Sequence, residues 1–216
     1  MNADDVARYL KQNPDFLAQH SELFAELTVP HPHGGQAISL AERQLHALRD
    51  KIRQLEHKLA ELIRFGEEND ELGEKVHRFS LALLDAADYD SLRHALFHHM
   101  QEDFAVPHVA LRIWNSVIAH DGEDFAEVSE AVRFHAGDLR HPYCGAPGHI
   151  EVLGWFGQAA PHVRSVALMP LRRGAQVFGL FALGSEETER FYAGMGTLYL
   201  GRIGELVSVA LLRQLG

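Results

Sequence analysis

Histidine is the residue type in this sequence with the widest capacity for chemistry, because its imidazole binds metals and exchanges protons near neutral pH. The chain of 216 residues contains 15 histidines. Three of them, His94, His98 and His99, fall on one predicted helix, where His94 and His98 are spaced to share a metal ion. A third ligand does not follow from this spacing. Exposed helical histidines are therefore the favoured interpretation.

The middle of the chain holds a second set of candidate ligands, whose imidazoles and thiol would suit iron or zinc if the fold gathered them. The set comprises His135, His141, Cys144, His149 and His162. These residues show no recognised ligand spacing. We therefore predict no metal site, and the sequence leaves the identity of any cofactor unknown.

Cys144 is the only cysteine in the sequence. A single cysteine excludes an internal disulfide and any zinc site with two or more cysteine ligands. The residue lies in "HPYCGAPG", after an aromatic side chain and before a Gly/Pro loop. Two interpretations stay open: an exposed, redox-sensitive thiol, or a buried and inert one.

The sequence lacks the motifs of well-known enzymes. It contains no GxSxG nucleophile elbow, no HExxH zinc motif and no carboxylate pair that spacing alone would nominate. The segment "GMGTLYLG" lacks the lysine of a phosphate-binding Walker loop and is interpreted as a helix start where glycines permit close packing. We expect a protein without enzyme activity.

The charge balance and the hydropathy disfavour two kinds of partner. The net charge is −10, and each side of the Asp85–Ala86 bond carries 10 basic and 15 acidic residues, so neither half offers the clustered cations that nucleic acid requires. The longest apolar stretches, such as "VFGLFAL", fall short of the roughly 20 residues that span a bilayer. The opening "MNADDVARYL" is too acidic for a secretory signal. We expect a cytoplasmic protein that binds neither nucleic acid nor membranes directly.

The predicted elements divide the chain into three parts. Residues 1–35 are interpreted as short helices followed by a Pro/Gly linker, and residues 36–85 as a long helix. Residues 86–216 follow an α+β plan of helix, strand, irregular middle, strand hairpin and terminal helix. The irregular middle is the part whose structure is least determined by pattern.

The long helix carries a narrow apolar seam. It begins after a capping box formed by Ser39 and Glu42. Positions a and d of its heptads are occupied by six aliphatic residues: Leu45, Leu48, Ile52, Leu55, Leu59 and Leu62. A seam of this width is typical of a coiled coil, so we predict a homodimer, with a helical hairpin folding back on itself as the alternative. Gly66 and Gly73 leave the continuity of the helix open.

Residue patterns in the C-terminal part predict how side chains are shared between the two faces of a sheet. One face of the strand "HVALRIW" carries Val109, Leu111 and Ile113, and the other carries Ala110, Arg112 and Trp114. The stretch "EDFAEVSEAVRF" predicts a short helix that brings together Phe125, Val128 and Val132. Two further strands are expected around an "RRGAQ" turn.

From Val76 to Leu215 the order of elements resembles a GAF domain. That resemblance implies a six-stranded antiparallel sheet and flanking helices, of which the first and last pack side by side and often dimerise. The stretches "VPHPHGGQAISLAERQLHALRDK", "YCG" and "LGSEETERFYAGMGTLYLGRIGELV" resemble the bacterial family known as domain of unknown function 484. This second resemblance covers nearly the whole chain and implies a GAF-like domain behind an N-terminal helical arm.

The ligand chemistry of well-known GAF domains does not carry over to this sequence. The ordered cyclic-nucleotide signature is absent, Gly145 stands where bilin attachment sites commonly have His after the cysteine, and methionine sulfoxide reductases of GAF fold need several cysteines. The resemblance nevertheless implies a pocket between the sheet and the irregular middle. We nominate six residues for its wall: Arg112, Trp114, Tyr143, Cys144, Trp155 and Phe156.

These patterns leave two functions open. The first is a non-enzymatic, homodimeric regulatory or sensor module that binds a small molecule and passes its state to a protein partner. The second is a ligand-free adaptor or scaffold whose helical arm binds a protein partner. The sequence names neither the ligand nor the partner.

Overall fold

The computed structural model describes residues 2–26, 28–29, 38–115, 122–148 and 150–215. The chain divides into two compact units, an N-terminal unit of Met1–Glu68 and a C-terminal unit of Asn69–Gly216. The boundary between them falls inside the long helix, whereas the sequence patterns predict boundaries at 35/36 and 85/86. Each unit is described by itself below.

Short helices open the N-terminal unit, as the sequence indicated. They are α1 (Ala3–Gln12), α2 (Phe16–Gln19) and α3 (Ser21–Glu26). The side chain of Asn2 accepts a hydrogen bond from the Asp5 N–H, and the Asp5 side chain bonds back to the Asn2 N–H, which caps α1. Two strands that the sequence did not predict, β1 (Thr28–Val29) and β2 (Ile38–Ser39), then pair antiparallel.

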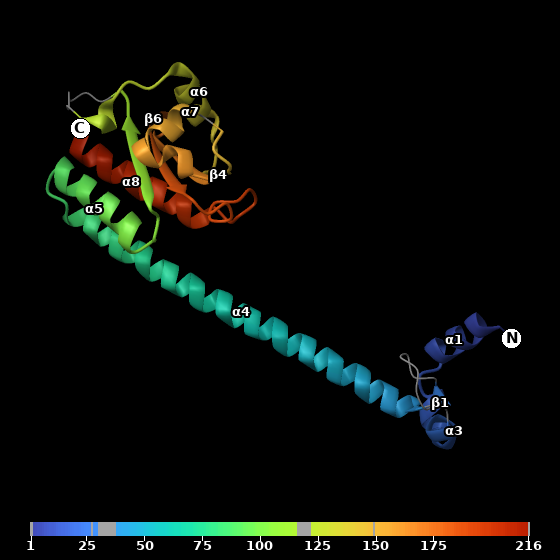
Figure 1. The fold of residues 1–216 in the computed structure, drawn as a ribbon. Coiled ribbons are helices and arrows are strands. Elements are labelled where there is room, and N and C mark those ends of the chain that lie inside the picture. The colour runs from blue at the N-terminus through green and yellow to red at the C-terminus, as the bar shows by residue number, and fades with distance from the viewer. Residues whose placement is uncertain (1, 27, 30–37, 116–121, 149, 216) are drawn as a thin grey trace. The chain divides into compact units, whose positions relative to one another are not determined.

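The long helix α4 runs without interruption from Leu40 to Asp85 (Figure 1). A Cβ atom added to Gly66 or Gly73 would meet nothing within 4 Å, so neither glycine marks a tight approach of another segment. The continuity that the sequence left open is thus settled as one uninterrupted run of helical residues. It also excludes a hairpin turn within this stretch.

The C-terminal unit is built on an antiparallel sheet. Its strands are β3 (His108–Ile113), β4 (Tyr143–Gly145), β5 (Ser165–Arg173) and β6 (Gln176–Ser185), in the order β3-β6-β5-β4. Among the described residues this sheet has four strands, fewer than the six implied by the GAF resemblance. Gly174 has φ +61° in the tight turn between β5 and β6, which explains a glycine in the predicted "RRGAQ" turn.

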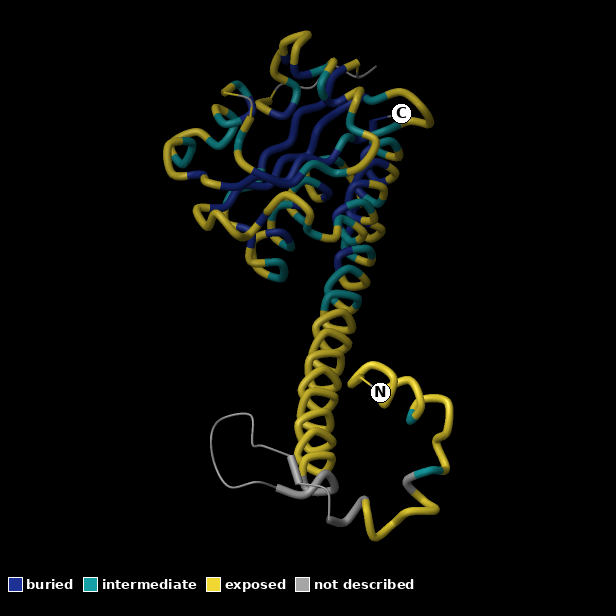
Figure 2. The backbone as a smooth tube through the Cα atoms, turned by 90° about the vertical axis from the view of Figure 1, so that its right-hand side faces the viewer, coloured by how far each residue is buried: buried dark blue, intermediate teal, exposed yellow. Residues whose placement is uncertain are grey.

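Helices cover both faces of this sheet, so two apolar clusters form the core. One face packs against the end of α4, α5 (Tyr89–Glu102) and α8 (Leu198–Leu215). The other packs against α6 (Glu130–Asp138) and α7 (Ile150–Gly154), and the 3₁₀ helix η2 (Gly157–His162) leads into β5. Figure 2 shows the strands of this sheet as buried, and it shows the turns of α4 from Arg43 to Glu68 as exposed. The α+β plan of the C-terminal part is confirmed.

The alternation predicted for β3 is confirmed. Leu111 and Ile113 belong to the cluster on the α5/α8 side, while Ala110 and Trp114 belong to the cluster on the α6/α7 side. This is the period of two that a pleated strand imposes.

The predicted grouping of Phe125, Val128 and Val132 was wrong. Phe125 packs against the α5/α8 cluster, and the two valines lie in the α6/α7 cluster. The chain forms a short 3₁₀ helix, η1 (Glu123–Phe125), and starts α6 anew at Glu130 behind the Ser129 cap. One continuous helical face therefore does not exist there.

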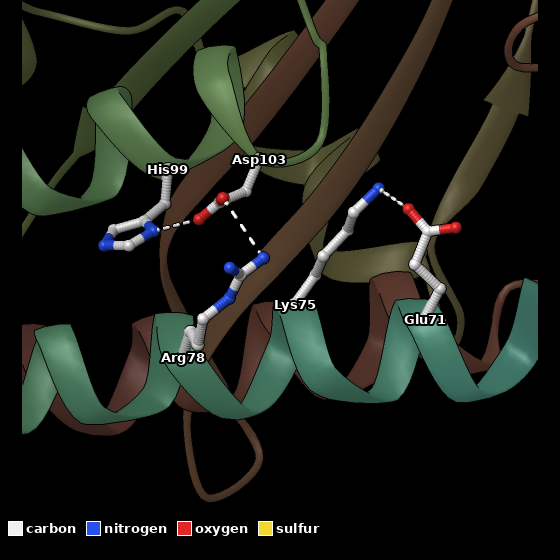
Figure 3. A network of polar contacts seen from close by, with 5 residues as sticks. All are labelled: Glu71, Lys75, Arg78, His99 and Asp103. Atoms are coloured by element: carbon white, nitrogen blue, oxygen red, sulfur yellow. Dashed lines mark hydrogen bonds and ion pairs between the residues drawn. The ribbon is translucent and has the colours of Figure 1, made fainter.

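A polar network holds the end of α4 against α5 (Figure 3). The Asp103 carboxylate lies 2.5 Å from Nδ1 of His99 and 3.4 Å from a guanidinium nitrogen of Arg78. Lys75 and Glu71 form a separate pair within α4, at 2.7 Å. The hydrogen bond with His99 and the charge of Arg78 hold the pKa of Asp103 below its ordinary value.

Hydrogen bonds also attach α8 to α4 at two points. The hydroxyl of Tyr199 donates to the Asn69 carbonyl at 3.0 Å, at the start of α8. Near its end, Arg213 donates to the carbonyl oxygens of Leu83, Leu84 and Ala86 at 3.2, 3.1 and 2.8 Å. Carbonyls at the end of α4 lack helical partners, so this arginine acts as their cap.

Gly179 in β6 should be far less tolerant of a methyl group than Gly201 in α8. A Cβ at Gly179 would lie 2.7 Å from the Arg112 carbonyl oxygen, whereas one at Gly201 would meet nothing within 4 Å. We expect Gly179→Ala to lower the free energy of unfolding by about 1–3 kcal/mol. We expect Gly201→Ala to raise it by up to about 1 kcal/mol, since alanine favours the helix. Urea denaturation measures both, and equal midpoints would contradict this packing.

The network around Asp103 should stabilise the fold only while its carboxyl group is charged. Because the folded pKa lies below the ordinary 3.8, the contribution is present above that pH and is lost as the pH falls through the folded value. Asp103→Asn should cost roughly 1 kcal/mol near neutral pH, a modest figure because the carboxylate is partly exposed. Its unfolding curve should approach that of the wild type in strong acid. Glu102→Gln, an exposed neighbour, is the control; a pH-independent loss would exclude the proposed cause.

Candidate functional site

Five of the six nominated pocket residues lie on the α6/α7 side of the sheet, four of them in its apolar cluster and Arg112 through its contact with Trp155. Arg112 and Trp114 come from β3, Tyr143 from β4, and Trp155 and Phe156 follow α7. The grouping that the resemblance implied is thus present for these five. The sixth, Cys144, belongs to the cluster on the opposite face.

Contacts among these residues are tight. The guanidinium carbon of Arg112 lies 5.1 Å from the centre of the Trp155 ring, and the same group donates to the Leu111 carbonyl at 2.8 Å. Burial lowers the pKa of Arg112 from its ordinary value. Trp114 Nε1 donates to the Val177 carbonyl at 3.1 Å, and the ring of Phe156 lies close to Gly184. Most of the nominated wall is therefore occupied with internal packing.

Cys144 is buried, with 8% of its surface exposed. Burial raises the pKa of its thiol to about 11, so the thiol stays protonated near neutral pH. The reactive form of cysteine is the thiolate. The structure thus favours the inert interpretation over the redox-sensitive one.

Histidines are not gathered for metal binding in the part of the chain that the structure describes. His94 and His98 stack with ring centres 5.9 Å apart, but no group of three or more His, Cys, Asp or Glu side chains forms there. His149, a candidate from the middle of the chain, lies outside the described residues.

A buried carboxylate that sequence reasoning missed is Asp124, which is 5% exposed. It accepts hydrogen bonds from the Tyr89 hydroxyl at 2.9 Å and from Nε of Arg93. Desolvation and the charge of Asp124 raise the pKa of Tyr89, and the same carboxylate raises that of Arg93. This arrangement ties η1 to α5 and leaves no unpaired reactive group. No pattern along the sequence could have found this arrangement, because Asp124 lies more than 30 residues from each of its two partners.

The six seam residues of α4 are all exposed, with between 52% and 66% of their surface accessible. They are Leu45, Leu48, Ile52, Leu55, Leu59 and Leu62. The helices α1 to α3 of the same unit therefore do not cover this seam. An apolar stripe of this length left in water is typical of a surface that binds a partner.

A second apolar surface lies in the C-terminal unit, between α4 and α8. We call it the α4–α8 groove; its volume is about 460 Å³ and its wall includes Val76, Ser80, Leu83, Leu84, Leu206 and Val209. Leu84 and Val209 are 67% and 69% exposed. Arg202 and Glu205 provide opposite charges in the same wall.

A third feature, which no sequence pattern predicted, is a cavity of about 260 Å³ between α8 and the sheet. We call it the α8–β5 cavity; its wall includes Arg140, His141, Met169, Arg172, Gly201 and Glu205. None of the six nominated pocket residues contributes to this wall.

In the described part of the chain, no helix combines the length and apolar character needed to cross a membrane.

Comparison with known proteins finds similarities in both sequence and fold. A relative from Shigella flexneri, "Uncharacterized protein YigA", is 26% identical over 205 residues, which cover 92% of this chain and 86% of the relative. The fold is similar to that of free methionine-R-sulfoxide reductase from Neisseria meningitidis, with a TM-score of 0.49, 16% identity and coverage of 66% and 89% of the two chains. It is also similar to the GAF domain of the potassium sensor histidine kinase KdpD from Escherichia coli, with a TM-score of 0.43, 14% identity and coverage of 66% and 94%.

The family model described as "Protein of unknown function, DUF484" matches residues 1–214. That match includes the three stretches from which the resemblance was first drawn. Because it spans nearly the entire sequence, the chain belongs to the DUF484 family.

Proposed function

We propose that this protein is a homodimeric regulatory module without catalytic activity, which passes its state to a protein partner. The observation that carries the proposal is the exposed heptad seam on α4. Fully burying one such aliphatic side chain contributes about 1.5–3 kcal/mol, so six exposed ones provide a large driving force for association. A second copy of the chain is the occupant that fits.

Register supports a second copy rather than an unrelated helix. The same a and d positions recur along the seam, so an identical helix presents matching knobs and holes. In a parallel pair, Lys51 at position g faces Glu56 at position e of the second copy. Further along α4 the apolar rhythm runs in a phase displaced by three residues from the seam, and Val76, Ser80 and Leu83 of this part line the α4–α8 groove.

The groove has features suited to two-fold pairing of identical surfaces. Leu84 and Val209 offer apolar area, and Arg202 can meet Glu205 of the second copy. Contacts that exchange in this way are characteristic of isologous dimers. The dimer contact would thus involve α8 as well as α4.

Transmission would run through the attachment of α8 to α4. Tyr199 and Arg213 bind α4 carbonyls near the two ends of α8, so a displacement of α8 changes contacts with α4. A ligand acts on such a pair only if it binds one helix arrangement more tightly than the other. The protein partner then senses the arrangement of the arm.

A ligand-free adaptor remains the second candidate function. The packing of Arg112 against Trp155 favours it, because side chains nominated as a ligand wall already contact each other. In this case the C-terminal unit is a rigid platform and the arm alone carries the activity.

Breaking the seam should dissociate the dimer. The double variant Ile52→Asp with Leu55→Asp places charges at one a and one d position, and we expect the dissociation constant to rise by at least about 100-fold. Light scattering during gel filtration measures the mass, and near-UV circular dichroism checks that the C-terminal unit stays folded. Gln54→Asp with His57→Asp, on the outer face of the same turns, is the matched control. A monomeric wild type, or a double variant of unchanged mass, contradicts the seam.

Thermal shift separates the two candidate functions. A ligand at 100 times its dissociation constant stabilises the folded protein by about 2.7 kcal/mol, so the regulatory module should show a raised melting temperature with at least one class of metabolite. The adaptor should show none. A neutral, inert polyol is the control. If it raises the melting temperature as much as the metabolite does, the stabilisation is a general solvent effect.

A further inference from the structure

The α8–β5 cavity has the chemistry of a binding site. We propose that it binds a small organic anion, with an apolar body against Met169, Leu200 and Gly201 and an anionic group held by Arg140 and His141. This inference names the ligand class of the regulatory module and, for its effect on the dimer, rests on the proposed function.

The cavity exists because α8 has glycine, and therefore no side chain, at two positions in the wall. A Cβ at Gly204 would lie 3.3 Å from Cβ of Met169, so this glycine sets the distance between α8 and β5. One turn earlier, Gly201 leaves open space, since a Cβ there would meet nothing within 4 Å. The Ser208 hydroxyl fixes the spacing, since it accepts from the Arg172 N–H at 3.1 Å and donates to the Gly204 carbonyl at 2.7 Å.

Cations gather at the rim of the cavity. The Arg172 guanidinium donates to the Leu139 carbonyl at 2.7 Å and more weakly to that of Gly137, which positions the turn that carries Arg140 and His141. The wall of the cavity contains two arginines, Arg140 and Arg172, and one carboxylate, Glu205. Arg140 and His141 are exposed, so their donors are accessible to a ligand. A carboxylate or phosphate group is the matching chemistry.

The size of the cavity limits the ligand. A volume of about 260 Å³ lies just below the roughly 300–1,000 Å³ typical of sites for drug-sized molecules. Met169, Pro170 and Leu200 give the wall an apolar part, so a fully hydrated inorganic ion would use only part of it. An anion attached to a small ring or short chain fits both features.

The position of the cavity would let a bound ligand affect the dimer contact. Glu205 and Val209 line both this cavity and the α4–α8 groove. A molecule in the cavity therefore contacts the turn of α8 that also faces the groove. Occupancy on one side of α8 would alter the surface offered to the second copy on the other.

Titration of the full-length protein with chosen probes tests the site. Phenylacetate and phenyl phosphate carry the two anionic groups on the same ring, benzyl alcohol is the neutral analogue, and inorganic phosphate lacks the apolar body. We expect one or both aromatic anions to bind with a dissociation constant below about 1 mM, and the other two probes at least about tenfold more weakly. The stronger aromatic anion identifies the preferred group. Equal binding of benzyl alcohol, or no binding by either aromatic anion, overturns the proposal.

Methionine methyl NMR locates the bound probe. The chain has four methionines, of which Met169 lines the cavity and Met100 is fully buried on α5. The Met169 signal should move on titration while that of Met100 stays. A shift confined to other methionines overturns the assignment.

Variants then connect binding to named groups. Arg140→Gln should weaken the aromatic anion roughly tenfold, because it removes one charged hydrogen bond. Gly201→Leu should abolish binding by filling the cavity, and Gly201→Ala should weaken it less. Arg173→Gln, next to Arg172 in β5 but outside the wall, should bind like the wild type. Unchanged affinity in both Arg140→Gln and Gly201→Leu overturns the site even if other variants fail to fold.

The seam variant separates this inference from the dimer proposal. If Ile52→Asp with Leu55→Asp still binds the probe, the anion site stands whatever the oligomeric state. A second outcome is that the wild-type dimer binds the probe while the dissociation constant of the dimer is the same with and without the probe. That result overturns the link between the site and the dimer, and the anion site itself stands.

Discussion

Six aliphatic side chains on α4 stand in water in the single chain, and their removal from water is the constraint on which the proposed assembly depends. The exposure of α4 to water differs along its length. From Arg43 to Glu68 its residues are exposed, whereas Phe79 and Leu83 are buried against the sheet of the C-terminal unit. One uninterrupted helix thus belongs to a globular core at one end and presents a seam at the other. A partner that covers the seam therefore acts on a helix that is part of the core.

The helix α8 has a comparable double role within the C-terminal unit. Its buried residues, among them Ile203, Val207 and Leu211, pack against the sheet, while Val209 stays exposed in the groove. Gly204 brings its backbone close to β5, and Gly201 leaves open space in the wall of the cavity. Capping of the α4 terminus by Arg213 then joins the two helices. A core helix that borders both a cavity and an exposed groove is a suitable element for coupling a ligand to an interface.

The charged groups of the described residues differ in how far contacts within the fold already engage them. The most buried charges are already committed: Asp124 to Tyr89 and Arg93, and Arg112 to a carbonyl and an aromatic ring. Cys144 is protonated and enclosed. Accessible cations occur instead at the rim of the α8–β5 cavity, where exposed donors can recognise an anion without a reactive group.

The sequence by itself determined what depends on residues close along the chain. Heptad spacing identified the seam of α4, alternation identified the two faces of β3, and a glycine turn joined β5 to β6, because each follows from the local geometry of helix, strand or turn. Alternation would also have separated Tyr143 from Cys144, had "YCG" been recognised as the strand β4 rather than treated as part of a loop. Only the tertiary structure decided the Asp124 network, the split of Phe125 from Val128, and the cavity that joins residues near 140, 170 and 204. Those features arise from contacts between distant segments, and no periodicity within one segment encodes which distant segment will pack against it.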